Sequence, residues 1–267
     1  METLMEEPAE PSLSKELVFQ FKSSLLKVRR GLQNALATLP YHLPAEQKEY
    51  PFEIAISSTP LWVDTTLSER ALQLGKAHNL RVAVRRIQHI AIPGGSVFSF
   101  WRQVGRATRR RGFVEGRQIS EGCLVPAIGG GLCQLSNALY DVALQIGAEI
   151  VERHPHTRIV PGSAAEQGRD ATLFWNYLDL RFCPKSDILL HAELTAESLV
   201  LRVFAKEPLP KKQANPTAIP LVASPRKSID IAEHSCQSCG RTSCFRHRQT
   251  LPATPYLAED YRRTAYL

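Results

Sequence analysis

Several features are missing from this sequence of 267 residues, and each absence excludes a class of protein. No run of about 20 apolar residues occurs, so we expect no membrane span. The opening residues, METLMEEPAEPSLSKELVF, lack the basic-then-apolar pattern of a signal peptide. We therefore expect a cytoplasmic protein whose thiols stay reduced. No internal repeat is present.

The composition that is present is typical of a soluble globular protein, with 43% hydrophobic and 22% charged residues. The length allows one sizeable core domain with extensions, or two small domains. A net charge of +7 favours anionic partners such as phosphates, nucleic acids or acidic membrane surfaces. In a reducing compartment the six cysteines are better interpreted as metal ligands, nucleophiles or core residues than as disulfides.

Near the N-terminus, apolar residues recur at intervals of three and four, which predicts one face of an amphipathic helix of about six turns. These residues are Leu17, Phe21, Leu25, Val28, Leu32 and Leu36. Ser14 is a candidate N-cap, and Pro40 closes the helix. We expect this helix to dock on the main domain rather than on a membrane, because its polar face mixes charges of both signs.

Further along the chain, helical patterns come first and strand patterns follow. The expected elements are a strand over 52–57, a helix over 68–90 with a possible break at Asn79, a turn and short strand over 92–100, a helix over 133–146, a strand interrupted at Pro155, and three successive antiparallel strands within 170–182, 187–195 and 198–205. This order predicts an α+β fold: N-terminal helices, then a mainly antiparallel sheet, with a central helix that starts at the GGGLC motif.

The same patterns predict five segments. They are a disordered lead with the amphipathic helix over 1–50, a core domain over 51–206, a Pro- and Lys-rich linker over 207–228, a Cys/His segment over 229–250 and a polar tail over 251–267.

The stretch GGGLCQ places three glycines directly before Cys133, where a helix is expected to begin. Glycines allow a close approach to a ligand, and the helix N-terminus favours a thiolate, which is the nucleophilic form of cysteine. The N–H groups there could also stabilise an oxyanion. His154 or His156 could act as the base, and Asp170 or Asp179 could orient it. Two other interpretations stay open: a glycine-rich binding site without chemistry, and an inert buried cysteine.

Several motifs together resemble the VanW family over roughly residues 70–200. They are IPGGSVFSFWRQVGRATRRRGFVEGRQI, GGGLCQLSNALYDVAL, IVERHPHTR and GRDATLFWNYLDLRF. The resemblance points to Gly129, Gly130, Gly131, Cys133, Gln134, Ser136, His154, His156, Asp170 and Asp179. It implies a link to cell-wall precursors or to the glycopeptide response, and it assigns no biochemical activity.

Nine arginines lie between residues 81 and 117, including the run Arg109, Arg110 and Arg111. The planar guanidinium suits phosphate and carboxylate groups. These residues are either a solvated surface or an anion site beside the glycine motif. No nucleic-acid-reading module is recognisable, so nucleic acid is not an expected partner.

The stretch HSCQSCGRTSCFRH contains a second candidate site, a cluster of cysteine and histidine residues. Three thiolates and an imidazole with short spacing predict a tetrahedral zinc site, and an iron–sulfur cluster is the alternative. The ligands would be Cys236, Cys239, Cys244 and His247. This cluster lies outside the VanW-like segment, so its expected role is structural or in binding a protein partner.

The leading hypothesis is a cysteine-dependent acyl transferase or hydrolase that acts on a cell-envelope precursor or a similar anionic substrate. The alternative is a non-enzymatic ligand-binding or adaptor module with a structural metal site.

Overall fold

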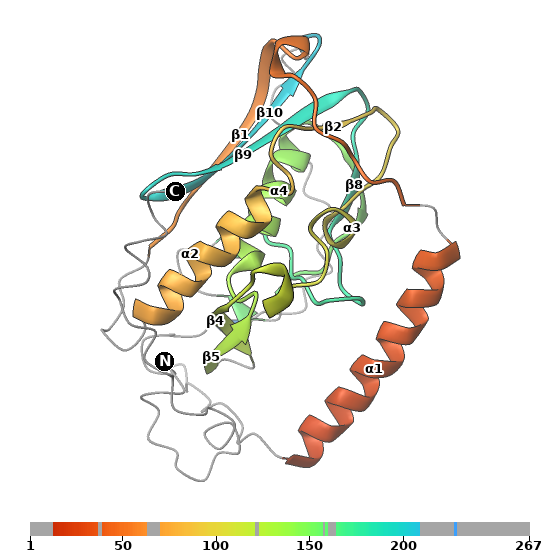
Figure 1. Cartoon of the computed structure of the whole chain (residues 1–267). Coiled ribbons are helices and arrows are strands. Elements are labelled where there is room, and N and C mark those ends of the chain that lie inside the picture. The colour runs from red at the N-terminus through yellow and green to blue at the C-terminus, as the bar shows by residue number, and fades with distance from the viewer. Residues whose placement is uncertain are drawn as a thin grey trace, which may run out of the picture.

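The computed structural model describes residues 13–36, 39–62, 70–120, 123–156, 158–159, 164–208 and 227–228 (Figure 1). Its elements, in chain order, are α1 (Leu13–Leu36), the 3₁₀ turn Gln47–Glu49, β1 (Phe52–Pro60), α2 (Arg70–Val84), β2 (Ile90–Ile92), β3 (Phe98–Ser99), α3 (Phe100–Val104), the 3₁₀ turn Arg109–Arg111, β4 (Glu115–Ser120), β5 (Cys123–Ile128), α4 (Leu132–Gln145), β6 (Glu149–Glu152), β7 (Arg158–Ile159), β8 (Arg181–Cys183), β9 (Ile188–Leu194), β10 (Ser198–Ala205) and β11 (Lys227–Ser228). Helices combined with antiparallel sheets confirm the predicted α+β class.

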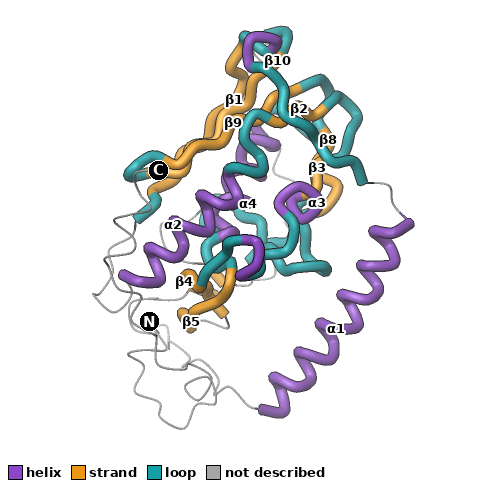
Figure 2. The backbone as a smooth tube through the Cα atoms, in the orientation of Figure 1, coloured by secondary structure: helices purple, strands orange, loops and turns teal. Residues whose placement is uncertain are grey.

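The main sheet has the strand order β1-β10-β9-β2, and all of its neighbouring strands are antiparallel. Helices α2 and α4 pack against each other and against this sheet (Figures 1 and 2). A smaller sheet has the order β3-β8-β6, and β4 pairs with β5 as a hairpin. The hairpin lies against α2, so the start of α4, which follows β5 directly, is held between the hairpin and α2.

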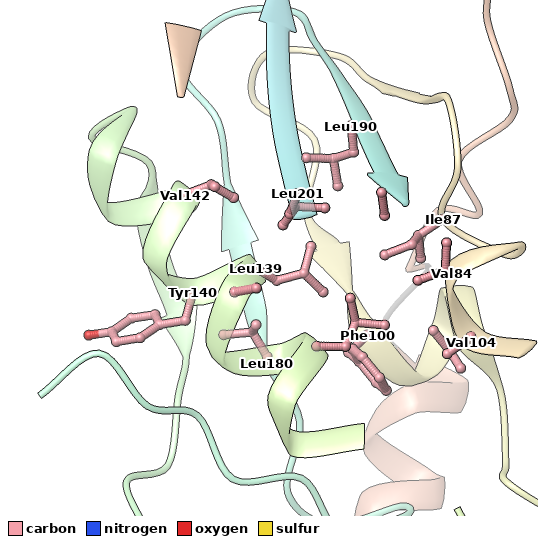
Figure 3. Packing of buried hydrophobic residues seen from close by; sticks show 14 of the residues in the cluster. Val84, Ile87, Phe100, Val104, Leu139, Tyr140, Val142, Leu180, Leu190 and Leu201 are labelled. Atoms are coloured by element: carbon pink, nitrogen blue, oxygen red, sulfur yellow. The ribbon is translucent and has the colours of Figure 1, made fainter. Parts of the chain in front are cut away.

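The hydrophobic core lies between α2, α3, α4 and the main sheet (Figure 3). From α4, Leu139 and Val142 are fully buried, and Leu190 and Leu201 meet them from β9 and β10. Phe100 of α3 is also fully buried. Truncating side chains of this kind costs about 2–5 kcal/mol each, so the core fixes the position of α4 firmly.

The expectation of three successive strands after residue 170 is wrong for the first of them. Residues 170–180 form an irregular segment with one turn, which the bridge between Phe174 and Leu178 closes. Only Arg181–Cys183 is a strand, and it pairs with β3 and β6 instead of β9. Asn176 adopts a left-handed backbone conformation with φ 60°, which a continuous strand does not allow. The hairpin β4–β5 was not anticipated.

The expected break at Asn79 is also absent, because α2 runs unbroken from Arg70 to Val84. The Asn79 side chain is fully buried and bonds outside its own helix. Its amide donates to the carbonyls of Val114 and Gly130, each at 3.0 Å. Those bonds satisfy a side chain that would otherwise compete with the helix backbone.

Helix α1 contacts the rest of the protein through polar groups rather than through its apolar face. Phe21 is 74% exposed, and the other apolar residues described on that face are exposed too. The contacts come from Arg30, which pairs with Glu152, and from the Lys27 carbonyl, which accepts a bond from Asn176. In Figure 1, α1 stands to one side of the sheet and its covering helices. Helix α1 thus contacts the main domain through these polar groups, while the described residues of its apolar face are exposed.

Candidate functional site

The start of α4 is held in place by the backbone of the glycine turn. The Gly129 N–H donates to the Val114 carbonyl at 3.0 Å, and the Gly130 N–H donates to the Ala127 carbonyl at 2.8 Å. Gly131 has φ 99°, a left-handed value that disfavours any side chain. A Cβ at Gly131 would also lie only 2.2 Å from Cγ of Lys76. Glycine is thus required directly before Cys133.

Cys133 lies in the first turn of α4, is part-buried, and packs in part against the hydrophobic core. Its side chain is hydrogen-bonded to His156. Burial raises the pKa of the thiol, but the hydrogen bond and charge of His156, with a backbone hydrogen bond from Leu173, outweigh burial and leave the pKa below its ordinary value. The thiolate is therefore favoured at this position.

His156 joins Cys133 to a buried carboxylate. Its Nδ1 lies 2.8 Å from Oδ2 of Asp170, and its backbone N–H donates to the same oxygen at 2.6 Å. Since Nδ1 faces Asp170, the other ring nitrogen is left for Cys133. Arg153 completes the group, because its NH2 donates to Oδ1 of Asp170 at 2.7 Å.

These contacts shift the pKa values of both partners. Burial lowers the pKa of His156, but the hydrogen bonds to Asp170 and Cys133 raise it to about 9. Burial raises the pKa of Asp170, but the bonds from His156 and the charge of Arg153 bring it well below its usual range. At neutral pH His156 is therefore an imidazolium beside the Asp170 carboxylate, and its charge and hydrogen bond favour the thiolate form of Cys133.

The backbone N–H groups beside Cys133 differ in their availability. Those of Leu132 and Gln134 donate to the carbonyls of Gly129 and Gly131, at 3.3 and 3.0 Å. In the part of the chain that the structure describes, the N–H groups of Gly131 and Cys133 have no backbone acceptor. Of the Gly131–Gln134 donors expected from the sequence, these two are the ones that could bind an oxyanion.

Gln134 and Ser136 make contacts that hold α4 in place. The Gln134 amide donates to Oγ1 of Thr59 at 2.9 Å and to the Pro60 carbonyl at 2.8 Å. The Ser136 hydroxyl donates to the Ala171 carbonyl at 2.5 Å, which ties α4 to the segment that carries Asp170. Both residues position the site rather than line it.

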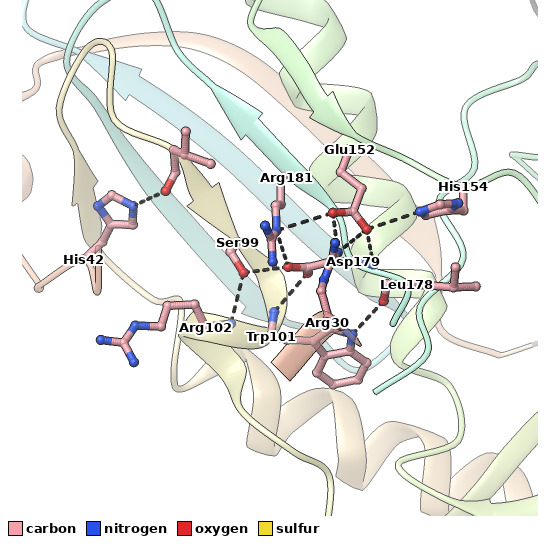
Figure 4. A network of polar contacts seen from close by, with 11 residues as sticks. Arg30, His42, Ser99, Trp101, Arg102, Glu152, His154, Leu178, Asp179 and Arg181 are labelled. Atoms are coloured by element: carbon pink, nitrogen blue, oxygen red, sulfur yellow. Dashed lines mark hydrogen bonds and ion pairs between the residues drawn. The ribbon is translucent and has the colours of Figure 1, made fainter. Parts of the chain in front are cut away.

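His154 and Asp179 belong to a separate polar network (Figure 4). Nε2 of His154 lies 3.2 Å from Oε1 of Glu152, and Asp179 accepts a bond from the Ser99 hydroxyl at 2.6 Å and from Nε of Arg181 at 2.8 Å. Burial raises the pKa of Asp179 despite these bonds. The structure thus places these two candidates away from Cys133, with partners of their own.

The arginine run forms the exposed 3₁₀ turn that precedes β4. Arg109 pairs with Glu115 at 2.5 Å, and NH2 of Arg111 donates to the Val104 carbonyl at 3.0 Å. Arg110 is exposed. The run therefore lies on the surface, and two of its three members already have protein partners.

The predicted metal ligands Cys236, Cys239, Cys244 and His247 lie outside the described residues. Among the residues that are described, no group of three or more His, Cys, Asp and Glu side chains could hold a metal ion. Within those same residues, no helix is both long and apolar enough to cross a bilayer.

Two residues near the site were missed at the level of sequence. Arg153 lies in the stretch ERHPHTR, of which only the two histidines were predicted to be functional. Lys76 is 7% exposed. It lies four residues after Leu72 and four before Leu80, both of which are buried, so helical spacing could have identified it as a lysine on an inward face.

The fold and site define an α+β protein in which a cysteine at a helix start meets a His–Asp pair. Residues 75–204 match the family model described as "VanW like protein", so this segment is a VanW-family domain. The match covers the glycine turn, Cys133, His156 and Asp170.

Two curated relatives support the assignment. The chain is 32% identical over 134 residues to the uncharacterized protein YoaR of Bacillus subtilis (strain 168), covering 49% of this chain and 44% of that protein. It is 30% identical over 168 residues to the vancomycin B-type resistance protein VanW of Enterococcus faecalis (strain ATCC 700802 / V583), covering 61% of each. The chain thus spans about half the length of the curated relatives it matches. No solved structure matches it.

Proposed function

We propose that this protein catalyses acyl transfer or hydrolysis through a covalent thioester on Cys133. The observation that carries the proposal is the connected series Cys133, His156 and Asp170, in which a part-buried sulfur has an imidazole neighbour and that imidazole has a buried carboxylate. A nucleophile, a base and a group that orients the base are the recurring parts of cysteine-dependent acyl transfer.

In the first half-reaction the Cys133 thiolate attacks the carbonyl carbon of an amide or ester. A C–S bond forms, and the carbonyl electron pair moves to oxygen, where the N–H groups of Gly131 and Cys133 stabilise it. Collapse of this intermediate breaks the bond to the leaving amine or alcohol, which takes its proton from the His156 imidazolium. With a pKa raised to about 9, His156 holds that proton at neutral pH.

In the second half-reaction water or an amine attacks the thioester and gives its proton to His156, which is now neutral. The C–S bond breaks and the Cys133 thiolate is restored. Asp170 holds the imidazole in one orientation throughout, and Arg153 holds Asp170 in turn. Asp170 and Arg153 are positioning residues in this scheme.

As the substrate class we propose an acyl group of a cell-envelope precursor or a similar anionic molecule. The name of the Enterococcus relative, which links that protein to vancomycin resistance, supports this choice. The cytoplasmic location and the C-terminal zinc site stay predictions from the sequence.

An activated ester tests the chemistry without knowledge of the natural substrate. The protein is incubated with p-nitrophenyl acetate, and acetylation is followed on each cysteine peptide by mass spectrometry. We expect rapid acetylation of Cys133 with a burst of p-nitrophenolate, and we expect His156→Asn to slow it by about 100-fold or more.

Cys183 provides an internal comparison, because it is a part-buried thiol of the same chain outside any disulfide. Within the described part of the structure, its side chain bonds only to the Pro184 carbonyl. If Cys133 is acetylated no faster than Cys183, the enzymatic proposal fails. The ligand-binding alternative would then be the better account of the glycine turn.

A further inference from the structure

The face of α2 that meets the glycine turn carries three buried polar residues: Gln73, Lys76 and Asn79. Positions three residues apart on a helix are neighbours on one face. Asn79 is accounted for by its bonds to the hairpin and to the Gly130 carbonyl. The burial of Gln73 and Lys76 is not explained by hydrogen bonds of this kind.

Gln73 is 2% exposed, and among the residues that the structure describes neither Oε1 nor Nε2 of its side chain has a hydrogen-bond partner. A buried amide with no partner is unusual, since most buried side-chain polar atoms are paired. Lys76 is 7% exposed, and the only charge among the described residues that shifts its pKa is another cation, Arg117. Burial and Arg117 together lower the pKa of Lys76 to about 8, so its ammonium is still largely protonated at neutral pH.

The Lys76 stem runs directly toward the start of α4. A Cβ built on Gly131 would lie 3.2 Å from Cα of Lys76, 3.0 Å from its Cβ and 2.2 Å from its Cγ. Cα, Cβ and Cγ of Lys76 are therefore the atoms nearest to that position, and the lysine stem packs against Gly131. Gly131 is the N-cap of α4 and precedes Cys133 by two residues, which places their Cα atoms within about 8 Å.

Close packing fixes this geometry. A Cβ on Gly75 would lie 1.9 Å from the Glu115 carbonyl oxygen, and one on Gly116 would lie 3.0 Å from the Lys76 backbone nitrogen. Two glycines thus let α2 lie against β4 almost in backbone contact. The lysine is held against the glycine turn by the fold and cannot swing away as a surface lysine could.

We propose that Lys76 and Gln73, with the N-terminus of α4, form a subsite that binds an oxyanion of the substrate, a carboxylate or a phosphate, beside the reacting acyl group. The inference rests on the proposed acyl chemistry at Cys133. A cation that lacks an acid partner and an amide with unused donors are the groups that bind an oxyanion, and the positive end of the helix dipole adds to them. Lys76 is thereby a residue that determines substrate specificity.

The test compares an anionic and a neutral reagent on the same thiolate. Iodoacetate and iodoacetamide react with Cys133 at rates that both scale with the thiolate fraction, so the ratio of the two rates cancels any change in the thiol pKa. The ratio is read on the Cys133 peptide by mass spectrometry. We expect Lys76→Gln to lower it on the order of fivefold, about the effect of losing one nearby positive charge in a partly solvated site.

Matched variants separate this subsite from the overall positive charge. Lys76→Arg keeps the charge and should retain most of the ratio. Lys185→Gln removes an exposed charge in the turn between β8 and β9 and should leave the ratio unchanged. Far-UV circular dichroism and the thermal midpoint show whether each variant is folded. An equal fall in the ratio for Lys185→Gln would overturn the proposal.

A second measurement uses the unaltered protein. Acetate or inorganic phosphate is added at constant ionic strength against chloride, and alkylation of Cys133 by iodoacetamide is followed. Stronger protection by acetate assigns a carboxylate, stronger protection by phosphate assigns a phosphate, and no protection by either overturns the subsite. If instead Cys133 reacts with iodoacetamide no faster than Cys183 does, it is the proposed function that fails.

Discussion

Replacing Asp170 by Asn tests the most buried electrostatic contact of the site. The Asp170 side chain is fully buried and accepts bonds from Arg153 and from the ring and backbone N–H of His156. An asparagine has nearly the same shape, but it carries no charge and only one acceptor oxygen. Its amide group would face N–H donors that need an acceptor.

The expected loss of stability is about 3–5 kcal/mol, the cost of removing one partner from a buried ion pair. Water cannot make up for the loss, because the Arg153 side chain is only 10% exposed and His156 is 31% exposed. A count of hydrogen bonds gives a similar loss of stability. The asparagine oxygen keeps one of these three bonds and two are lost, and each hydrogen bond to a charged group contributes about 1.5–3 kcal/mol.

The directions of the two pKa shifts determine how the stability lost in Asp170→Asn depends on pH. The pKa of Asp170 is lowered in the folded protein, so its contribution is fully present above the unfolded value of about 3.9 and is lost as the pH falls below that value. The pKa of His156 is raised to about 9, so its contribution is fully present below about 6.5 and is lost as the pH rises through 9. The difference between the two proteins should therefore be largest between about pH 4 and 6.5.

Urea denaturation of both proteins at several pH values measures the effect. Asp187→Asn is the matched control, because that carboxylate is 44% exposed and pairs with an exposed Lys206. The control should lose at most about 1 kcal/mol. A loss for Asp170→Asn that equals the control at pH 6 would refute the charged arrangement of the site.

Three further predictions concern the fold and the C-terminal segment. Gly131→Ala should lower the free energy of unfolding by about 2 kcal/mol or more, because the new Cβ would collide with Lys76 of α2. Gly147 also has a left-handed backbone, with φ 63°, but it faces open space, so Gly147→Ala should cost about 1 kcal/mol. Phe98→Ala should cost about 3–5 kcal/mol and Phe21→Ala less than about 0.5 kcal/mol, since the first side chain is fully buried and the second is 74% exposed; equal losses in thermal unfolding would contradict the described position of α1. Elemental analysis should find about one zinc per chain that is lost on deletion of residues 229–250, and iron with labile sulfide would contradict the zinc prediction.

The sequence could predict the site as far as its local features reach. Glycines followed by a cysteine and an apolar helical pattern define the start of α4, and the observed helix begins one residue earlier than expected. The sequence left both His154 and His156 as candidates, with a slight preference for His156 because the residues after Pro155 were expected to re-enter the strand. Only the tertiary arrangement directs one ring toward Asp170 and the other toward Glu152.

Other parts could not be predicted because long-range contacts decide them. Residues 170–180 have the apolar and aromatic content of a strand, yet Asp179 bonds to the Ser99 hydroxyl and to the Trp101 backbone and holds the segment in an irregular conformation. The buried position of Lys76 depends on the close approach of α2 to β4, which two separate glycines permit. Neither the partner strand nor the facing glycine is visible in a local pattern.

The pH dependence of Cys133 alkylation tests the central claim most directly. The rate with iodoacetamide is measured on the Cys133 peptide from pH 4 to 10, in the unaltered protein and in His156→Asn. The account predicts a midpoint below the ordinary thiol value of about 8.5, and a midpoint that moves upward when His156 is replaced. A midpoint at or above 8.5 in the unaltered protein, or one that His156→Asn leaves in place, would contradict it.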